Sequence, residues 1–390
     1  MNTFVKKIAG LLSVGVLSIG LLAGCGSGSD KASKDDNIIY LGAAGPFTGD
    51  NAEYGTEWKK GFDIALEEIN AKGVAGGKKL QIIYEDTQSD PKQSATVAQK
   101  FVKNDKIYAV FCDFTTNSTW SAAPIYQKAG LVQLAPNPSH PQLTKPGNYI
   151  FQLCPTQADQ AKALSTLAVD ELKAKKIAVI YLNTDFGKAV KDNVVTAAKA
   201  KGVENAGEES YLPTDKDFKA QLTKIKTGNP EVIVLGSYYT DGALIVKQAR
   251  DLGINAQFIA SSSVHSPALF QLGGSAVNGL ITMSVFNVSN PGETLKNFSA
   301  KYSSKYKANE PDTFATQAYD AIRLIANAIN KTYEKNKKVT RQGIRDELAS
   351  TKDFPAASQD SITYSANRQL ENAKLYPIIA KDGKFLPYKK

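Results

Sequence analysis

The chain of 390 residues has little of what metal and disulfide sites need, since it contains only three cysteines and two histidines. Beyond Cys25, the cysteines are Cys112 and Cys154, and two cysteines do not make a disulfide framework. The sequence allows either a single disulfide bond between them or two buried free thiols. His140 and His265 fall in predicted loops without a third residue at metal-ligand spacing. No metal and no cofactor are therefore expected.

Sequence signatures of common enzymes are missing as well. The chain has no G-x-S-x-G elbow, no H-E-x-x-H pair, no G-x-x-x-x-G-K-S/T loop and no C-x-x-C pair. Acidic pairs such as Glu67 and Glu68 lie near lysines on one predicted helix, which is typical of a solvated surface. An enzymatic function is therefore not expected.

Long apolar runs are also missing, except near the N-terminus. Residues 1–24 carry two positive charges near their start, Lys6 and Lys7. An uncharged apolar stretch follows, and small residues precede Cys25. This order predicts a secretory signal peptide, and its apolar stretch is short for a membrane-spanning helix. The protein is therefore expected outside the cytoplasm.

The end of this segment, LLAGC, resembles the lipobox of bacterial lipoproteins. The resemblance implies that Cys25 carries the lipid and becomes the first residue after cleavage, so the protein would be held on the outer face of the membrane. An ordinary signal peptide with a chance cysteine is the alternative. Residues 25–37 contain almost nothing apolar and predict a flexible tether.

The net charge of +9 is a modest excess for a chain of this length. Its lysines are scattered over predicted helix faces, which indicates a solvated surface and not a nucleic-acid groove. Hydrophobic residues make up 42% of the chain and charged residues 22%, as in globular proteins of roughly two domains.

From residue 38 onward, strand-like and helix-like periodicities alternate. We expect strands at 38–45, 80–86, 107–113, 131–136, 176–183, 231–239 and 257–263, and short ones at 361–365 and 374–380. We expect helices at 58–73, 94–104, 119–130, 159–175, 187–202, 242–253, 313–331 and 340–350. This order predicts an α/β fold with two doubly wound parallel-sheet lobes.

The two lobes are expected to exchange the chain more than once. The N-terminal lobe is predicted to contain 38–154 and 284–361, and the C-terminal lobe 155–283 and 362–390. The hinge would then lie near Cys154, Met283 and Ile362. Polar loops follow six of the strands, at 45–55, 113–119, 136–141, 183–187, 237–242 and 261–265. Ligands bind at the carboxyl ends of parallel strands, so these loops predict a cleft between the lobes.

Several of these segments carry a family resemblance. The stretches 45–55, 70–94, 115–144, 185–190 and 236–253 resemble the solute-binding proteins of branched-chain amino-acid ABC transporters, which have the type I periplasmic-binding-protein fold, and 84–95 is the most specific part. The resemblance implies an extracytoplasmic receptor, expected to be monomeric, that closes on a small carboxylate-bearing solute and delivers it to an ABC transporter permease. A sensor that presents the ligand to a signalling receptor is the alternative.

The resemblance also assigns ligand-binding roles. Thr116, with Thr115 beside it, stands where a hydroxyl binds the ligand carboxylate, and Asn137 and Ser139 stand where both ends of the ligand are held. The aromatic side chains that close over the ligand correspond to Tyr54, Phe186 and Tyr238. The hydroxyls of the loop that contains Thr116 also suit helix caps, and this alternative stays open.

One position departs from the family pattern. Ser262 stands where the family usually has an acidic residue that neutralises the ammonium group of the ligand. Without that residue, amino-acid binding is expected to weaken at least about tenfold unless Asp113 or Asp241 compensates. The expected ligand is therefore a carboxylate with an apolar or aromatic body, either a branched-chain amino acid or a related acid.

Overall fold

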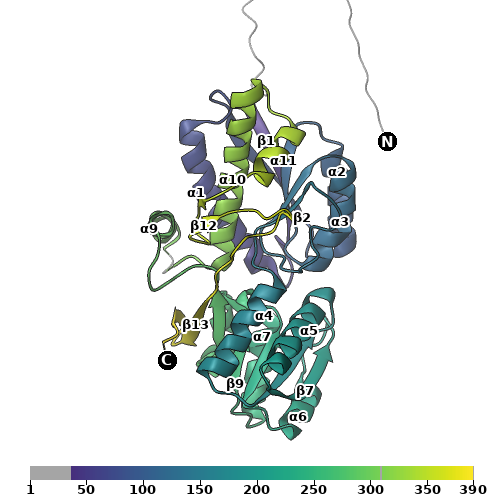
Figure 1. Cartoon of the computed structure of the whole chain (residues 1–390), viewed down its shortest axis with the longest axis vertical. Helices are drawn as coiled ribbons and strands as arrows, with labels where there is room; N and C mark the ends of the chain where they lie inside the picture. Colours follow the sequence, from purple (N-terminus) through teal and green to yellow (C-terminus); the bar gives the residue numbers. More distant parts are fainter. Residues whose placement is uncertain (1–36, 308–309, 390) are drawn as a thin grey trace, which may run out of the picture.

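The computed structural model describes residues 37–307 and 310–389, and the predicted signal peptide, Cys25 and nearly all of the tether lie outside these ranges. The chain forms two lobes stacked along the long axis of the molecule (Figure 1). Each lobe has a central sheet flanked by helices, so the predicted α/β fold with two doubly wound lobes is confirmed. In the described residues, no helix is both long and apolar enough to cross a membrane.

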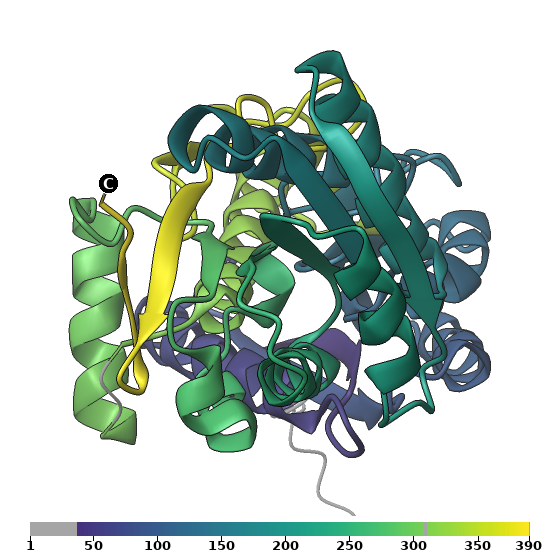
Figure 2. The ribbon, with the colours of Figure 1, turned by 90° about the horizontal axis from the view of Figure 1, so that it is seen from below.

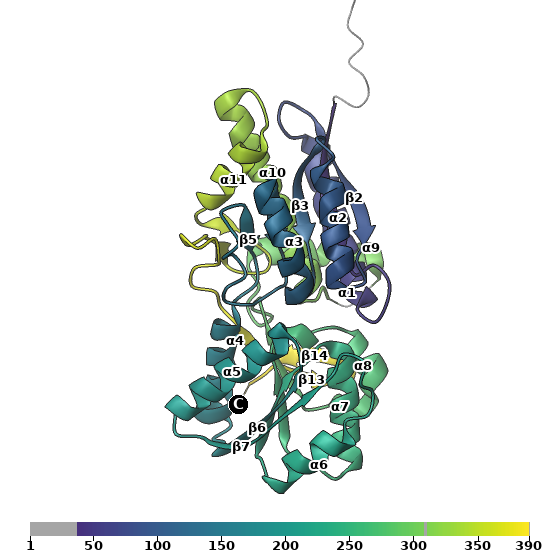
Figure 3. The ribbon, with the colours of Figure 1, turned by 90° about the vertical axis from the view of Figure 1, so that its right-hand side faces the viewer.

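The N-terminal lobe has a five-stranded parallel sheet in the order β2-β1-β3-β4-β5. Its strands are β1 (Ile38–Gly45), β2 (Lys79–Asp86), β3 (Ile107–Cys112), β4 (Val132–Ala135) and β5 (Ile150–Gln152). Helices α2 (Pro91–Val102) and α3 (Thr116–Lys128) cover one face, and α1 (Ala52–Lys72) and α10 (Thr313–Asn336) cover the other (Figures 1 and 3). Helices α9 (Glu293–Tyr306) and α11 (Arg341–Ala349) lie beside this second layer.

Helix α1 shows how the sequence determines this packing. Tyr54, Trp58, Phe62 and Ala65 recur at helical spacing, and all four are fully buried. They form one apolar stripe that faces the sheet and α10. Burial of such large side chains contributes roughly 1.5–3 kcal/mol each, which anchors the loop between β1 and α1 at the carboxyl end of the sheet.

The C-terminal lobe has a seven-stranded sheet in the order β14-β13-β10-β9-β8-β6-β7. Its parallel part contains β6 (Lys176–Leu182), β7 (Glu204–Tyr211), β8 (Val232–Gly236), β9 (Gln257–Ala260) and β10 (Ile281–Ser284). The antiparallel strands β13 (Tyr376–Lys381) and β14 (Lys384–Pro387) extend one edge, opposite β7 (Figure 2).

Five helices and one helical continuation accompany this sheet. They are α4 (Gln157–Ser165) with its π-helical continuation (Thr166–Glu171), α5 (Asp185–Ala200), α6 (Lys219–Thr227), α7 (Tyr239–Asp251) and α8 (Ala268–Gly273). The region 159–175, predicted as one helix, therefore changes its helical type partway. Of the elements named so far, strands β5, β7, β10 and β14 and helices α6, α8 and α9 had no counterpart in the sequence prediction.

The chain passes between the lobes three times, after β5, after β10 and before β13. The third passage lies beyond its predicted position at Ile362. The small pair β11 (Phe354–Pro355) and β12 (Ser361–Ile362) precedes it, and Arg368 still donates to the carbonyls of Ile150 and Thr144 at 3.2 and 3.1 Å. These contacts to buried carbonyls keep the segment beside the N-terminal lobe until β13.

Gln359 connects the second and third passages. Its Nε2 donates to the carbonyl of Val285 at 2.7 Å, and its Oε1 accepts from the backbone N–H of Lys374 at 2.8 Å.

The two cysteines in the described residues, Cys112 and Cys154, are both buried free thiols, and only Cys154 lies near a passage.

Candidate ligand-binding site

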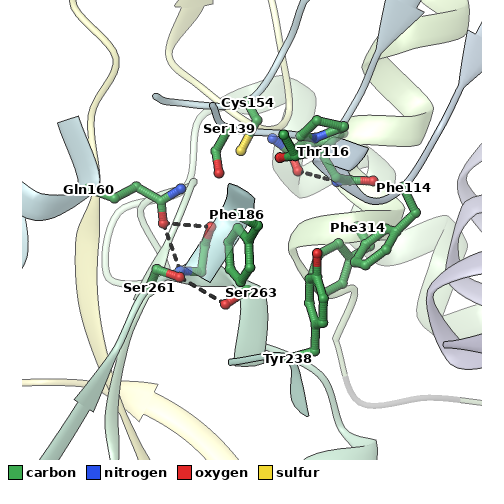
Figure 4. Close-up of a pocket in the computed structure, with 14 residues that line it drawn as sticks. Phe114, Thr116, Ser139, Cys154, Gln160, Phe186, Tyr238, Ser261, Ser263 and Phe314 are labelled. Atoms are coloured by element: carbon green, nitrogen blue, oxygen red, sulfur yellow. Dashed lines mark hydrogen bonds between the residues drawn. The ribbon is translucent and has the colours of Figure 1, made fainter. Parts of the chain in front are cut away.

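A small cavity of about 20 Å³ lies between the two lobes, with side chains from both lobes around it (Figure 4). Its walls come from five of the six predicted loops, after β3, β4, β6, β8 and β9, together with Cys154 after β5 and the starts of α4 and α10. The sixth predicted loop, 45–55 after β1, contributes no lining residue. The lining residues are Phe114, Thr116, Asn137, Pro138, Ser139, Cys154, Gln160, Phe186, Tyr238, Ser261, Ser262, Ser263, Phe314 and Gln317.

The start of α3 brings two adjacent threonines to this region with different roles. Thr115 caps the helix, since its Oγ1 accepts from the backbone N–H of Ser118 at 3.3 Å and donates to Ser118 Oγ at 2.9 Å. Thr116 lines the cavity, and its buried Oγ1 has no hydrogen-bond partner among the described residues. A buried hydroxyl without a partner at a helix N-terminus is suited to an anionic group of a ligand.

The loop after β4 is fixed by hydrogen bonds to residues of α1, α4 and α10. Asn137 accepts from the indole N–H of Trp58 and donates to Gln317 Oε1 at 2.5 Å. Ser139 Oγ accepts from the carboxamide of Gln157, and the Ser139 carbonyl accepts from the Gln157 backbone N–H at 2.7 Å. The loop geometry is therefore set before a ligand arrives, and the Ser139 hydroxyl keeps its own proton for donation.

Aromatic rings from both lobes form the apolar wall. In the C-terminal lobe, Phe186 and Tyr238 stack at 4.8 Å between ring centroids, with 10° between their planes. In the N-terminal lobe, Phe114 and Phe314 meet edge to face at 5.6 Å. Phe114 and Tyr238 approach to 5.5 Å across the lobes, so this wall is continuous when the lobes are together (Figure 4).

Tyr54 lies behind this wall, although it was predicted to close over the ligand. Its ring stacks on Phe114 at 3.8 Å, and it does not line the cavity. Its hydroxyl donates to the carbonyl of Ser263 at 2.7 Å and accepts from the backbone N–H of Tyr239 at 3.1 Å. Tyr54 therefore connects the lobes, and neither it nor Thr115 lines the cavity, in contrast to the other predicted ligand-binding residues.

Ser262, which replaces the acidic residue of the family pattern, lies on the cavity wall and is buried. Both its backbone N–H and its hydroxyl donate to Gln160 Oε1, at 2.9 and 3.1 Å. Gln160 Nε2 donates in turn to the carbonyl of Pro155 at 3.3 Å. A neutral carboxamide and a hydroxyl therefore occupy this part of the wall.

Asp113 and Asp241, the two candidate replacements for the missing acid, are not among the lining residues. The carboxylate of Asp241 accepts from the Tyr211 hydroxyl and from the backbone N–H of Tyr238. The carboxylate of Asp113 accepts from the backbone N–H of Phe114 at 2.5 Å. Burial raises the pKa of each carboxyl to about 6, and both carboxylates are held by hydrogen bonds within the protein, outside the cavity lining.

The two histidines lie outside the cavity lining. His140 packs on Trp120 at 4.3 Å between ring centroids. His265 is buried in the C-terminal lobe, and its Nδ1 is 2.8 Å from Thr313 Oγ1 at the start of α10 in the N-terminal lobe. Burial lowers the pKa of His265 to about 3. No group of potential metal ligands occurs in the described residues.

Several lining residues were not singled out from the sequence. Phe314 and Gln317 lie on the first turns of α10, whose N-cap is Asp312, and Gln160 lies on the first turn of α4. The only local sign in the sequence that these residues could reach a ligand was their place just after a helix cap.

Burial raises the pKa of the Cys154 thiol to about 12, so this cavity residue is neutral.

Comparison with known proteins gives a consistent result. A family model described as periplasmic binding protein matches residues 38–383. An amino acid binding protein from Pseudomonas aeruginosa is 30% identical over 295 residues, which cover 75% of this chain and 78% of that protein. Leu/Ile/Val-binding protein homolog 1 from Brucella abortus is 30% identical over 291 residues, with 74% and 77% covered.

Solved structures show the same fold. The branched-chain amino acid transporter substrate binding protein LivJ from Streptococcus pneumoniae, in complex with isoleucine, has a TM-score of 0.82 and 29% identity, covering 89% of this chain and 97% of that one. The leucine binding protein LivK from Thermotoga maritima has a TM-score of 0.84 at 24% identity, with 90% and 98% covered, and supports the fold alone.

Proposed function

The chain belongs to the periplasmic binding protein family, and from this premise we propose that it is the extracytoplasmic solute receptor of an ABC importer. The observation that carries the proposal is the cavity between the lobes, where the Thr116 hydroxyl is buried without a partner in the described residues. A site with hydroxyl donors at a helix N-terminus and aromatic walls suits a small carboxylate with an apolar or aromatic body. Branched-chain amino acids and related acids fit this description.

Lobe closure is the proposed mechanism of capture. The described conformation is closed, because Asn117 donates to Asp185 at 2.9 Å and Lys216 pairs with Asp50 at 3.0 Å, both across the lobes. A cavity of about 20 Å³ is smaller than such a solute, so the lobes must separate for entry and then close around it less tightly than in the described conformation. A ligand that contacts both lobes stabilises the closed state by its differential affinity.

We further propose that the receptor is anchored by lipid on Cys25, acts as a monomer and delivers its solute to an ABC transporter permease. The relation to periplasmic binding proteins supports a location outside the cytoplasm and a binding function without catalysis. A ligand-presenting sensor would use the same cavity, and co-purification with a permease or with a signalling receptor distinguishes the two roles.

Two measurements test this function together. Native mass spectrometry of freshly purified protein should show acyl groups on Cys25 and a retained small carboxylate. Small-angle scattering after removal and re-addition of that solute should show a more compact molecule with ligand. An unchanged scattering profile with the solute demonstrably bound would contradict the closure mechanism, and an unmodified Cys25 would contradict the anchor.

A further inference from the structure

The cavity contains no charged side chain opposite the carboxylate-binding hydroxyls. None of its lining residues is aspartate, glutamate, lysine or arginine. At the position of the missing acid, Gln160 Oε1 already accepts two hydrogen bonds from Ser262. An ammonium group brings three donors and a full charge, and in the described residues this wall offers it no carboxylate, only neutral oxygens of which that of Gln160 is already engaged.

Neighbouring acceptors are also engaged. The carbonyl of Ser261 accepts from Thr282 Oγ1 at 2.6 Å, and the carbonyl of Ser263 accepts from the Tyr54 hydroxyl at 2.7 Å. Ser263 Oγ donates to the carbonyl of Ser237 at 2.7 Å. The serine run at the end of β9 is thus held by hydrogen bonds within the protein, and it does not form a ring of free acceptors.

The aromatic wall does not replace the missing charge. A ring binds a cation through its open face, and here Phe186 and Tyr238 cover one face of each other. One face of Phe114 is covered by Tyr54 in the same way. Each of these three rings therefore has at most one open face for a cation, whereas an apolar body can contact the whole wall.

We propose, on the basis of the receptor function above, that Gln160 and Ser262 form a neutral polar subsite that selects the ligand class. The preferred ligand is a small carboxylate whose second polar group is an uncharged oxygen, as in a 2-oxo or 2-hydroxy acid. Of the two Gln160 amide hydrogens, one bonds Pro155 and the second is available for such an oxygen, while the Ser262 oxygen can accept from a ligand hydroxyl. An ammonium group at the same place would lose its hydration without a compensating carboxylate.

Isothermal titration calorimetry with three probes of one carbon skeleton tests the proposal: 4-methyl-2-oxopentanoate, 2-hydroxy-4-methylpentanoate and leucine. We expect the oxo or hydroxy acid to bind at least about tenfold more tightly than leucine. Gln160→Glu keeps the shape of the side chain and adds a carboxylate, so it should reverse the preference. Ser262→Asp provides a second route to the same reversal if the first variant folds poorly.

Gln271→Glu is the matched control, because this exposed residue of α8 lies in the same lobe and outside the cavity lining. It should leave the order of affinities unchanged. Equal or tighter binding of leucine by the unmodified protein would overturn the neutral subsite but not the receptor function. Failure of every probe to bind would overturn both.

Discussion

Thr115 and Thr116 are adjacent threonines, and their hydroxyl groups have different roles. The hydroxyl of Thr115 is used inside the protein as the cap of α3, whereas that of Thr116 is buried at the cavity without a partner in the described residues. We therefore expect Thr115 to contribute to the stability of the fold and Thr116 to contribute to ligand binding.

We expect Thr115→Ala to lower the free energy of unfolding by about 1 kcal/mol, because it removes the helix cap. Thr116→Val keeps the side-chain shape and should change stability little, yet weaken carboxylate binding by about tenfold or more. Chemical denaturation and calorimetric titration of both variants measure the two effects. Unchanged affinity in Thr116→Val would exclude its hydroxyl from the ligand contacts.

The sequence predicted many residues of the site because they follow strand ends, which meet at one edge of a parallel sheet. It could not predict which side chains of these loops point inward. Tyr54 illustrates this, since it was expected in the loop after β1 but lies on the first turn of α1, and Phe114 lies between it and the cavity. Gln160 and Phe314 were missed because their positions depend on how α4 and α10 pack between the lobes.

Among the secondary-structure elements, α1 and α7 meet across the lobes at their N-terminal ends. The Tyr54 hydroxyl accepts from the Tyr239 N–H, one of the first N–H groups of α7, which have no partner within their own helix. The same hydroxyl donates to the Ser263 carbonyl, so one side-chain group satisfies two backbone groups of the other lobe.

Tyr54→Phe should therefore destabilise the closed state selectively. It leaves an N–H and a carbonyl unpaired at the closed boundary, at a cost of about 1–3 kcal/mol, and both groups are solvated when the lobes separate. We expect ligand affinity to fall roughly 5- to 150-fold with little change in the unfolding midpoint of the ligand-free protein. Tyr181→Phe, on β6, is the control; equal losses of affinity in both variants would argue against a closing role.

The accuracy of the prediction for each element follows its burial. Strands β1, β3 and β8 are apolar runs buried on both faces, and their sequences are typical of central parallel strands. Strand β7 lies at the sheet edge and reads ENAGEESY, with half of its residues exposed and only Tyr211 buried, so no period-two apolar pattern marks it. Helix α9 packs mainly through Leu295, Phe298 and Tyr302, which is a narrow stripe in a polar sequence.

At the scale of the whole molecule, stability depends on pH through His265. Its folded pKa of about 3 lies below the ordinary value near 6.5, so the unfolded chain binds more protons at intermediate pH. The free energy of unfolding is therefore unaffected by protonation of His265 above about pH 6.5, where the ring is neutral in both states, and it decreases as the pH falls toward 3. Asp113 and Asp241 act in the opposite direction between about pH 4 and 6, because their folded pKa values are raised.

His265→Gln isolates the histidine contribution, because the two aspartates are present in both proteins. Between pH 7 and pH 4, the wild type should lose about 3 kcal/mol more of its unfolding free energy than the variant. Urea denaturation at both pH values measures this difference, with His140→Gln as the control for the partly exposed histidine. Parallel pH profiles in wild type and His265→Gln would show that folding does not change the proton affinity of this ring.

The two-lobe plan could be predicted because the β-α alternation restarts after residue 154. The third passage could not be placed, because the arginine and glutamine that hold it to the N-terminal lobe, Arg368 and Gln369, lie in a polar stretch without periodicity. Gln369 Nε2 donates to Gln152 Oε1 at 2.8 Å, a contact between positions far apart in the chain. Only the folded arrangement brings such partners together.

The position of β13 and β14 has a consequence for how the protein is made. A ribosome synthesises the N-terminus first, yet the sheet of the C-terminal lobe is completed by the final residues, where β13 pairs with β10 and β14 pairs with β13. Until those residues emerge, the edge of β10 has no antiparallel neighbour. The growing polypeptide therefore cannot complete this lobe early, which would keep the chain open for the export that we propose.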